Sequence, residues 1–69
     1  MKRYAVKLTK DDNVTILGVR DTRIEAMELG AELRKQYSRD EGLLACIEAE
    51  FDENDRIVGG GYRLLEVFR

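Results

Sequence analysis

Large apolar side chains alternate with smaller or polar ones near the start of the chain. Over Tyr4–Thr9 they occupy every second position, which predicts a β-strand with one buried face. A polar turn follows at residues 10–13, and the next segment, Val14–Val19, is apolar and rich in β-branched residues. The first twenty residues therefore predict a β-hairpin.

The pattern changes to a helical period over Asp21–Tyr37. Thr22 and Glu25 have the spacing of a capping box, in which each side chain accepts a hydrogen bond from a backbone N–H of the first turn. Apolar or small residues gather on one side of this helix, namely Ala26, Met27, Gly30, Leu33 and Tyr37. Glycine is unfavourable within a helix, so Gly30 on this side predicts close approach of the helix to a sheet. We expect the helix to end near residues 38–42.

The rest of the chain predicts a second hairpin. Leu43–Asp52 alternates strictly and is the clearest strand, and Asp52–Asp55 is a polar turn. Ile57–Phe68 then returns as a strand that is broken or bulged at Gly59–Gly61. Together the elements predict one α+β domain over residues 1–69, of order β-β-α-β-β. The simplest sheet is antiparallel with strand order 2-1-3-4, and the helix crosses one face.

A single helix leaves the other face of this sheet uncovered. The last strand nevertheless has apolar residues of both parities, and so does the segment Val14–Val19. Such a pattern is unexpected for a strand with one wet face, and it predicts an exposed apolar patch that marks an interaction site. The simplest partner is a second copy of the chain, paired by a twofold axis. The residues expected at this interface are Tyr62, Leu64, Leu65, Val67 and Phe68.

Composition excludes several kinds of chemistry. The 69 residues include no histidine and a single cysteine, Cys46, which cannot form an intrachain disulfide. We therefore expect no zinc site, no other metal and no cofactor. No apolar segment reaches the length of a membrane span, and the N-terminal residues lack the apolar core of a signal peptide. A cytoplasmic protein is expected.

Two turn-like segments resemble ligand sites, but each favours a structural interpretation. Gly59–Gly61 lacks the neighbouring lysine and the following helix of a phosphate-binding loop, so a bulge is favoured. Asp52–Arg56 is rich in oxygen ligands, but its spacing does not fit a calcium-binding loop, so a solvated turn is favoured.

Two further features suggest catalysis. Cys46 has no histidine to act as its base, so we interpret it as a buried structural thiol. Glu48 and Glu50 share one strand face, which is compatible with acid–base chemistry. Cross-strand ion pairs with Lys7 and Arg63 explain the same four charges without catalysis.

These patterns predict a non-catalytic interaction or regulatory module that self-associates. The alternative is a small nucleic-acid-binding accessory protein that uses the sheet face or the hairpins, where cations contact phosphates and tyrosines stack on bases. Its basic residues would be Arg3, Lys7, Arg56 and Arg63. A net charge of −2 argues against this alternative. An enzyme is not expected.

Overall fold

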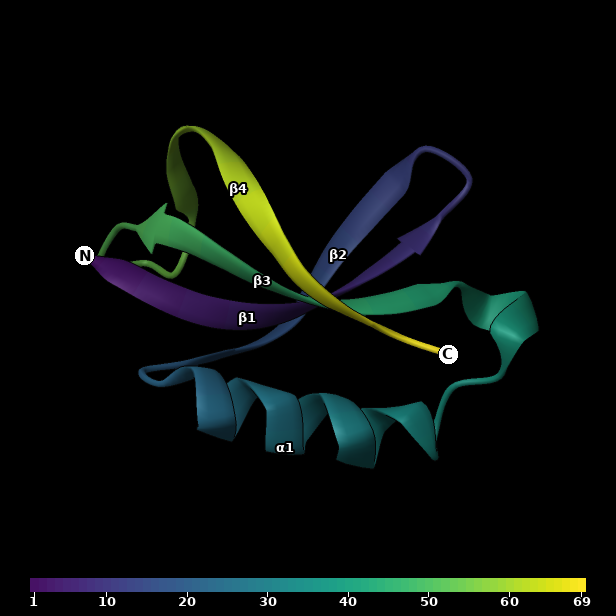
Figure 1. The fold of residues 1–69 in the computed structure, drawn as a ribbon. Coiled ribbons are helices and arrows are strands. Elements are labelled where there is room, and N and C mark those ends of the chain that lie inside the picture. Colours follow the sequence, from purple (N-terminus) through teal and green to yellow (C-terminus); the bar gives the residue numbers. More distant parts are fainter.

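The computed structural model describes residues 1–69 and has the predicted α+β architecture of one helix on a four-stranded antiparallel sheet (Figure 1). The elements in chain order are β1 (Lys2–Lys10), β2 (Asn13–Arg20), α1 (Arg23–Arg34), a 3-10 turn η1 (Arg39–Glu41), β3 (Leu43–Phe51) and β4 (Ile57–Phe68). The strand order β2-β1-β3-β4 is the predicted one. No helix of the structure has the length and apolar character needed to cross a membrane.

The helix α1 begins as predicted and ends earlier. Thr22 is its N-cap, and the Thr22 hydroxyl accepts a hydrogen bond from the amide of Glu25 at 3.2 Å. The helix ends at Arg34 rather than near residue 38, and η1 and Gly42 carry the chain back to the sheet. Gly42 has φ = 136°, a conformation that favours glycine.

The predicted close approach at Gly30 is confirmed. A Cβ atom added to Gly30 would lie 2.2 Å from the ring of Phe68 on β4. A Cβ added to Gly18 on β2 would lie 2.6 Å from the side chain of Leu29. The two glycines therefore let α1 rest directly on the outer strands, and they identify the sheet face that the helix covers.

Central strand β1 differs from the half-buried strand expected from its alternation. Ala5, Val6 and Lys7 are all buried, although successive side chains point to opposite faces. In Figure 1 the sheet is strongly twisted, and one end of β2 and one end of β4 rise away from α1 while their other ends run toward it. On the face opposite α1, Ile16 and Val19 of β2 pack against the group of buried residues that contains Ala5, so Ala5 is buried without a helix above it.

Three irregularities in the ladders shape the outer strands. Leu17 on β2 and Leu65 on β4 have no partner on the neighbouring strand, because the register shifts by one residue at each. Gly59–Gly61 is a larger bulge with no partners on β3, as predicted, and φ is 81° at Gly59 and 83° at Gly60. At this bulge β4 turns from rising to descending (Figure 1).

Candidate functional site

We call the sheet face opposite α1 the open face. Its floor consists of the central strands β1 and β3, and its walls consist of the edge strands β2 and β4, each of which rises away from α1 over part of its length (Figure 1). On the floor Ala5 and Ile47 are fully buried, as are nearly all of Ala49 and Phe51. Side chains from the walls pack partly against this floor, namely Ile16, Val19 and Ile57. The open face therefore contains a hydrophobic core of its own.

Part of the open face remains in contact with water. Four large apolar side chains there are about half exposed, and we call them the apolar rim: Val14 at 51%, Leu43 at 48%, Tyr62 at 48% and Leu64 at 53%. Val14 on β2 and Leu43 on β3 both lie opposite Thr9 of β1, so their side chains point to the same sheet face as Thr9. The rim comes from three strands, β2, β3 and β4.

The single-residue bulges explain why apolar residues of both parities appear in the outer strands. On β2, Ile16 lies opposite Lys7 and Val19 lies opposite Ala5. Both side chains therefore point to the open face, although the two residues are separated by an odd number of positions. On β4, Leu64 and Val67 do the same on either side of Leu65. Each bulge changes the parity of its strand, and therefore much of the apolar excess seen in the sequence falls on one face.

A buried lysine lies on the floor of the open face. Lys7 is only 7% exposed, and its ammonium donates a hydrogen bond to Thr9 Oγ1 at 2.8 Å. The Lys7 Nζ atom also lies 5.4 Å from the centre of the Tyr62 ring, within the range of a cation–π interaction. No carboxylate lies within ion-pair distance of Lys7. A hydroxyl and an aromatic ring therefore compensate the buried charge within the chain.

The predicted ion pairing of Lys7 with the glutamates of β3 is wrong. Tyr4 lies opposite Glu48, so Lys7, three residues further along β1, points to the other face. Glu48 instead approaches Arg63 at 4.0 Å, as expected, and Glu50 pairs with the N-terminal ammonium at 3.0 Å. Each of these two carboxylates therefore has its own cationic partner.

The predicted interface residues are divided by the structure. Tyr62 and Leu64 belong to the apolar rim, and Val67 lies opposite Ala45 on the open face. Leu65 is the unpaired residue of the β4 bulge. Phe68 belongs to the helix-covered face, where its ring lies against Gly30. Sequence parity could not separate these residues, because the bulge between them was not visible.

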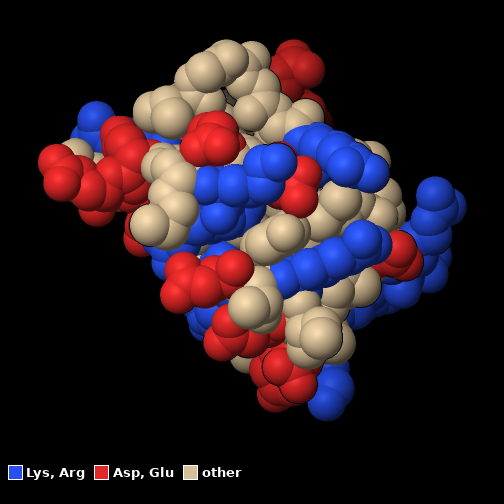
Figure 2. Space-filling view, turned by 60° about the vertical axis from the view of Figure 1, so that its left-hand side comes forward, with Lys and Arg blue, Asp and Glu red and all other residues tan.

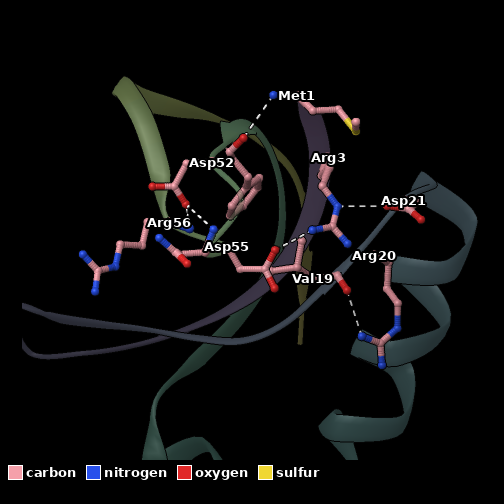
Figure 3. Close-up of polar contacts among 10 residues, drawn as sticks. Met1, Arg3, Val19, Arg20, Asp21, Asp52, Asp55 and Arg56 are labelled. Atoms are coloured by element: carbon pink, nitrogen blue, oxygen red, sulfur yellow. Dashed lines mark hydrogen bonds and ion pairs between the residues drawn. The ribbon is translucent and has the colours of Figure 1, made fainter.

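The four cations proposed for nucleic-acid binding do not form one surface. Lys7 is buried, and Arg63 lies on the other sheet face beside Glu48. Arg3 bonds to Asp21 and Asp55, and it thereby joins β1 to the chain before α1 and to the β3–β4 turn (Figure 3). Figure 2 shows the same mixing of charges on the surface, where Lys and Arg alternate with Asp and Glu.

Arg56 lies in a turn whose geometry is set by Asp52. The Asp52 carboxylate accepts hydrogen bonds from the amides of Arg56 at 3.0 Å and Asn54 at 2.8 Å (Figure 3). The Arg56 amide is the main cause of a lowered pKa at Asp52, and the Asn54 amide adds to it. The segment is thus the solvated turn predicted from its sequence.

Cys46 is the buried thiol that the sequence indicated. It is fully buried between α1 and the sheet, and burial raises its pKa, partly offset by the charge of Arg23. A protonated thiol without a neighbouring base is a poor nucleophile. No group of three or more acidic, cysteine or histidine side chains has an arrangement that could hold a metal ion.

A hollow lies at one end of the molecule, beyond the last turn of α1. It is an open cleft of about 630 Å³, which we call the basic cleft. Four segments line it: the end of β1 with its turn, the end of α1 with η1, the start of β3, and the end of β4. Sequence reasoning missed this cleft, because no local motif marks a hollow assembled from four separate segments.

Comparison with known proteins finds no matching family model, no matching curated protein and no matching solved structure.

Proposed function

We propose that the chain is a non-catalytic interaction module that pairs with a second copy of itself through the open face. The observation that carries this proposal is the apolar rim: Val14, Leu43, Tyr62 and Leu64 stand half exposed around a buried apolar floor. Exposed apolar groups clustered on one surface are typical of protein–protein contacts. Tyrosine is also among the residues enriched in the buried centres of interfaces.

The charges of the open face favour a second copy over a charged partner. No acidic residue of the four strands points to the open face. Arg3, at one end of this face, is already paired with Asp21 and Asp55. The one central cation, Lys7, is compensated by Thr9 and Tyr62 and almost inaccessible. A partner therefore needs an apolar surface and no countercharge, and another open face provides one. A twofold dimer would use the same residues on both chains.

The experiment is a mass measurement by gel filtration with light scattering at about 100 µM, where dimers with micromolar dissociation constants are well populated. The wild type should have twice the 8.0 kDa mass of the chain. Leu64→Glu should give a folded monomer, because it places a charge in the rim. Ile24→Glu is the matched control, since Ile24 is 73% exposed on α1, outside the open face. It should remain dimeric.

A monomeric wild type at this concentration would overturn pairing between copies. Equal disruption by both glutamate variants would instead remove the open face from the interface. Far-UV circular dichroism of each variant separates loss of association from loss of folding.

A further inference from the structure

The basic cleft concentrates positive charge in an acidic chain. Four cations line it, from four different elements or turns: Lys10, Arg34, Arg39 and Arg69. Two carboxylates, Asp11 and Asp40, line it as well, which leaves a surplus of two positive charges in a chain of net charge −2. The remaining surface of the protein is correspondingly more acidic, so this end of the molecule is the one that attracts anions.

None of these four cations is in an ion pair. Outside the cleft three cations are in ion pairs: Arg3 binds two aspartates, Lys35 approaches Glu32 at 3.7 Å, and Arg63 approaches Glu48. The other five cations are unpaired as well, so it is the gathering of four cations around one cleft that distinguishes this end of the molecule. The negative end of the α1 dipole explains a cation in its last turn, and Arg34 occupies that position. The dipole acts only within that turn, so it does not explain Lys10, the last residue of β1, or Arg69, which follows β4.

The floor of the cleft is apolar and partly aromatic. Leu44 is almost fully buried there, and the rings of Tyr37 and Phe68 are half-buried in the lining. Figure 1 shows η1 and the C-terminus meeting at this end of the molecule. A ligand in this cleft therefore contacts cations around the mouth and apolar or aromatic carbon beneath.

We propose that the basic cleft binds a nucleotide, with its phosphates held by Lys10 and Arg39 and its base packed on the apolar floor beside Tyr37. Guanidinium groups bind phosphate oxygens in pairs, and an ammonium adds a point charge. Bases stack on aromatic side chains with little dependence on sequence. The step that we assign to the cleft is binding, with no chemical reaction. The four cations of the cleft lie outside the apolar rim, although Leu43 lines the cleft and belongs to the rim.

The test is a titration of ¹⁵N-labelled protein with ATP to about 1 mM, a concentration that detects dissociation constants in the weak millimolar range. ATP should shift the amide signals that line the cleft, with Tyr37, Arg39 and Gly42 among them, and leave the distant Asp52–Arg56 turn unchanged. Shifts confined to another surface, or no shifts at all, would overturn the proposal.

Two smaller probes separate the parts of the ligand. Pyrophosphate carries the charge without the ring, and adenosine carries the ring without the charge. ATP should bind more tightly than either, because only ATP uses both the cations and the apolar floor. Pyrophosphate that binds as tightly as ATP would overturn the nucleotide assignment and leave a site for inorganic anions only.

Matched double variants test the cations. Lys10→Gln with Arg39→Gln removes two exposed charges of the cleft and should weaken ATP binding by about tenfold or more, as expected for charged hydrogen bonds. Arg20→Gln with Arg56→Gln removes two exposed charges outside the cleft and should leave the affinity unchanged. Equal weakening by both pairs would show unspecific attraction and overturn the site. All four residues are exposed, so folding is retained, and the amide spectrum itself checks this.

Discussion

On the helix-covered face of the sheet, Val6 and Cys46 are fully buried; on the open face, Ala5 and Ile47 are fully buried too. The first pair is covered by a separate element, α1, which approaches closely because Gly18 and Gly30 have no side chains. The second pair is covered by side chains of the sheet itself, namely Ile16 and Val19 of β2 and Ile57 of β4. A twisted sheet with bulged outer strands can therefore bury both faces with a single helix.

The two faces differ in what they leave exposed. On the helix-covered face Val6, Leu44 and Cys46 are buried, whereas on the open face the four residues of the apolar rim remain about half exposed. We infer that the open face is the part of the molecule whose burial is completed by a partner.

The largest expected effect tests whether the hydrophobic core of the open face contributes as much to the free energy of unfolding as the core of the helix-covered face. Ile47→Ala should lower the free energy of unfolding by about 3 kcal/mol, the usual cost of removing a buried isoleucine side chain. Val6→Ala, on the other face, should cost about 2 kcal/mol because it removes fewer atoms. Urea denaturation measures both. If Ile47→Ala lowers the free energy of unfolding by less than about 1 kcal/mol, the floor of the open face is not a hydrophobic core.

The next prediction concerns only the packing of α1 on the helix-covered face. Gly30→Val should destabilise the fold by about 2–3 kcal/mol, because the new side chain would occupy the space of the Phe68 ring. Ala31→Val, exposed on the same helix, controls for the poorer helix propensity of valine and should cost under about 1 kcal/mol. Similar midpoints for the two variants in urea would contradict the close contact of α1 with β4.

A smaller effect concerns the bend of β4 that raises one wall of the open face. Gly59→Val and Gly60→Val should each cost about 1–2 kcal/mol, because φ is positive at both positions and valine adopts it poorly. Gly61→Val should be nearly neutral, since its φ is not positive and nothing lies within 4 Å of an added Cβ. Thermal or urea unfolding distinguishes the three. A uniform response would contradict the backbone explanation.

Loss of the helix cap should be smaller still. Thr22→Ala removes the acceptor of the Glu25 amide and should cost about 1 kcal/mol. Thr22→Ser keeps the hydroxyl and should stay close to the wild type. An alanine variant with an unchanged urea midpoint would show that the start of α1 is held by its contacts with the sheet rather than by the cap.

The smallest effect, and the one of opposite sign, concerns Lys7. Lys7→Met keeps a long side chain and removes a buried charge that has no carboxylate partner, so stability should rise by up to about 1 kcal/mol. Lys7→Glu places the opposite charge beside Thr9 and Tyr62 and should destabilise. A clear loss of stability in Lys7→Met would show that the hydroxyl and ring contacts outweigh the cost of burying the ammonium.

Local patterns determined most of the elements. The alternation of Tyr4–Thr9 and Leu43–Asp52, the N-cap at Thr22 and the glycine triplet each depend on residues close in sequence, and all four appear where they were expected. The other half of the predicted capping box differs, because the Glu25 carboxylate accepts a hydrogen bond from the Thr22 hydroxyl. Element order then limited the topology, because two hairpins flanking one helix have few antiparallel arrangements. Turn residues at 52–55 were equally local, since Asp52 bonds to amides only two and four residues away.

Only the tertiary structure decided which apolar residues share a face and where the chain is hollow. A bulge of one residue at Leu17 or Leu65 leaves no distinct trace in composition, yet it reverses the parity of every side chain beyond it. For the same reason sequence alone grouped Phe68 with the exposed residues. The wrong pairing of Lys7 with the glutamates of β3 has a different cause, because the regular β1–β3 register that places them on opposite faces cannot be read from either strand alone. The basic cleft, likewise, exists only where four segments separated by many residues meet. Local interactions specify elements, but register and curvature depend on all strands together.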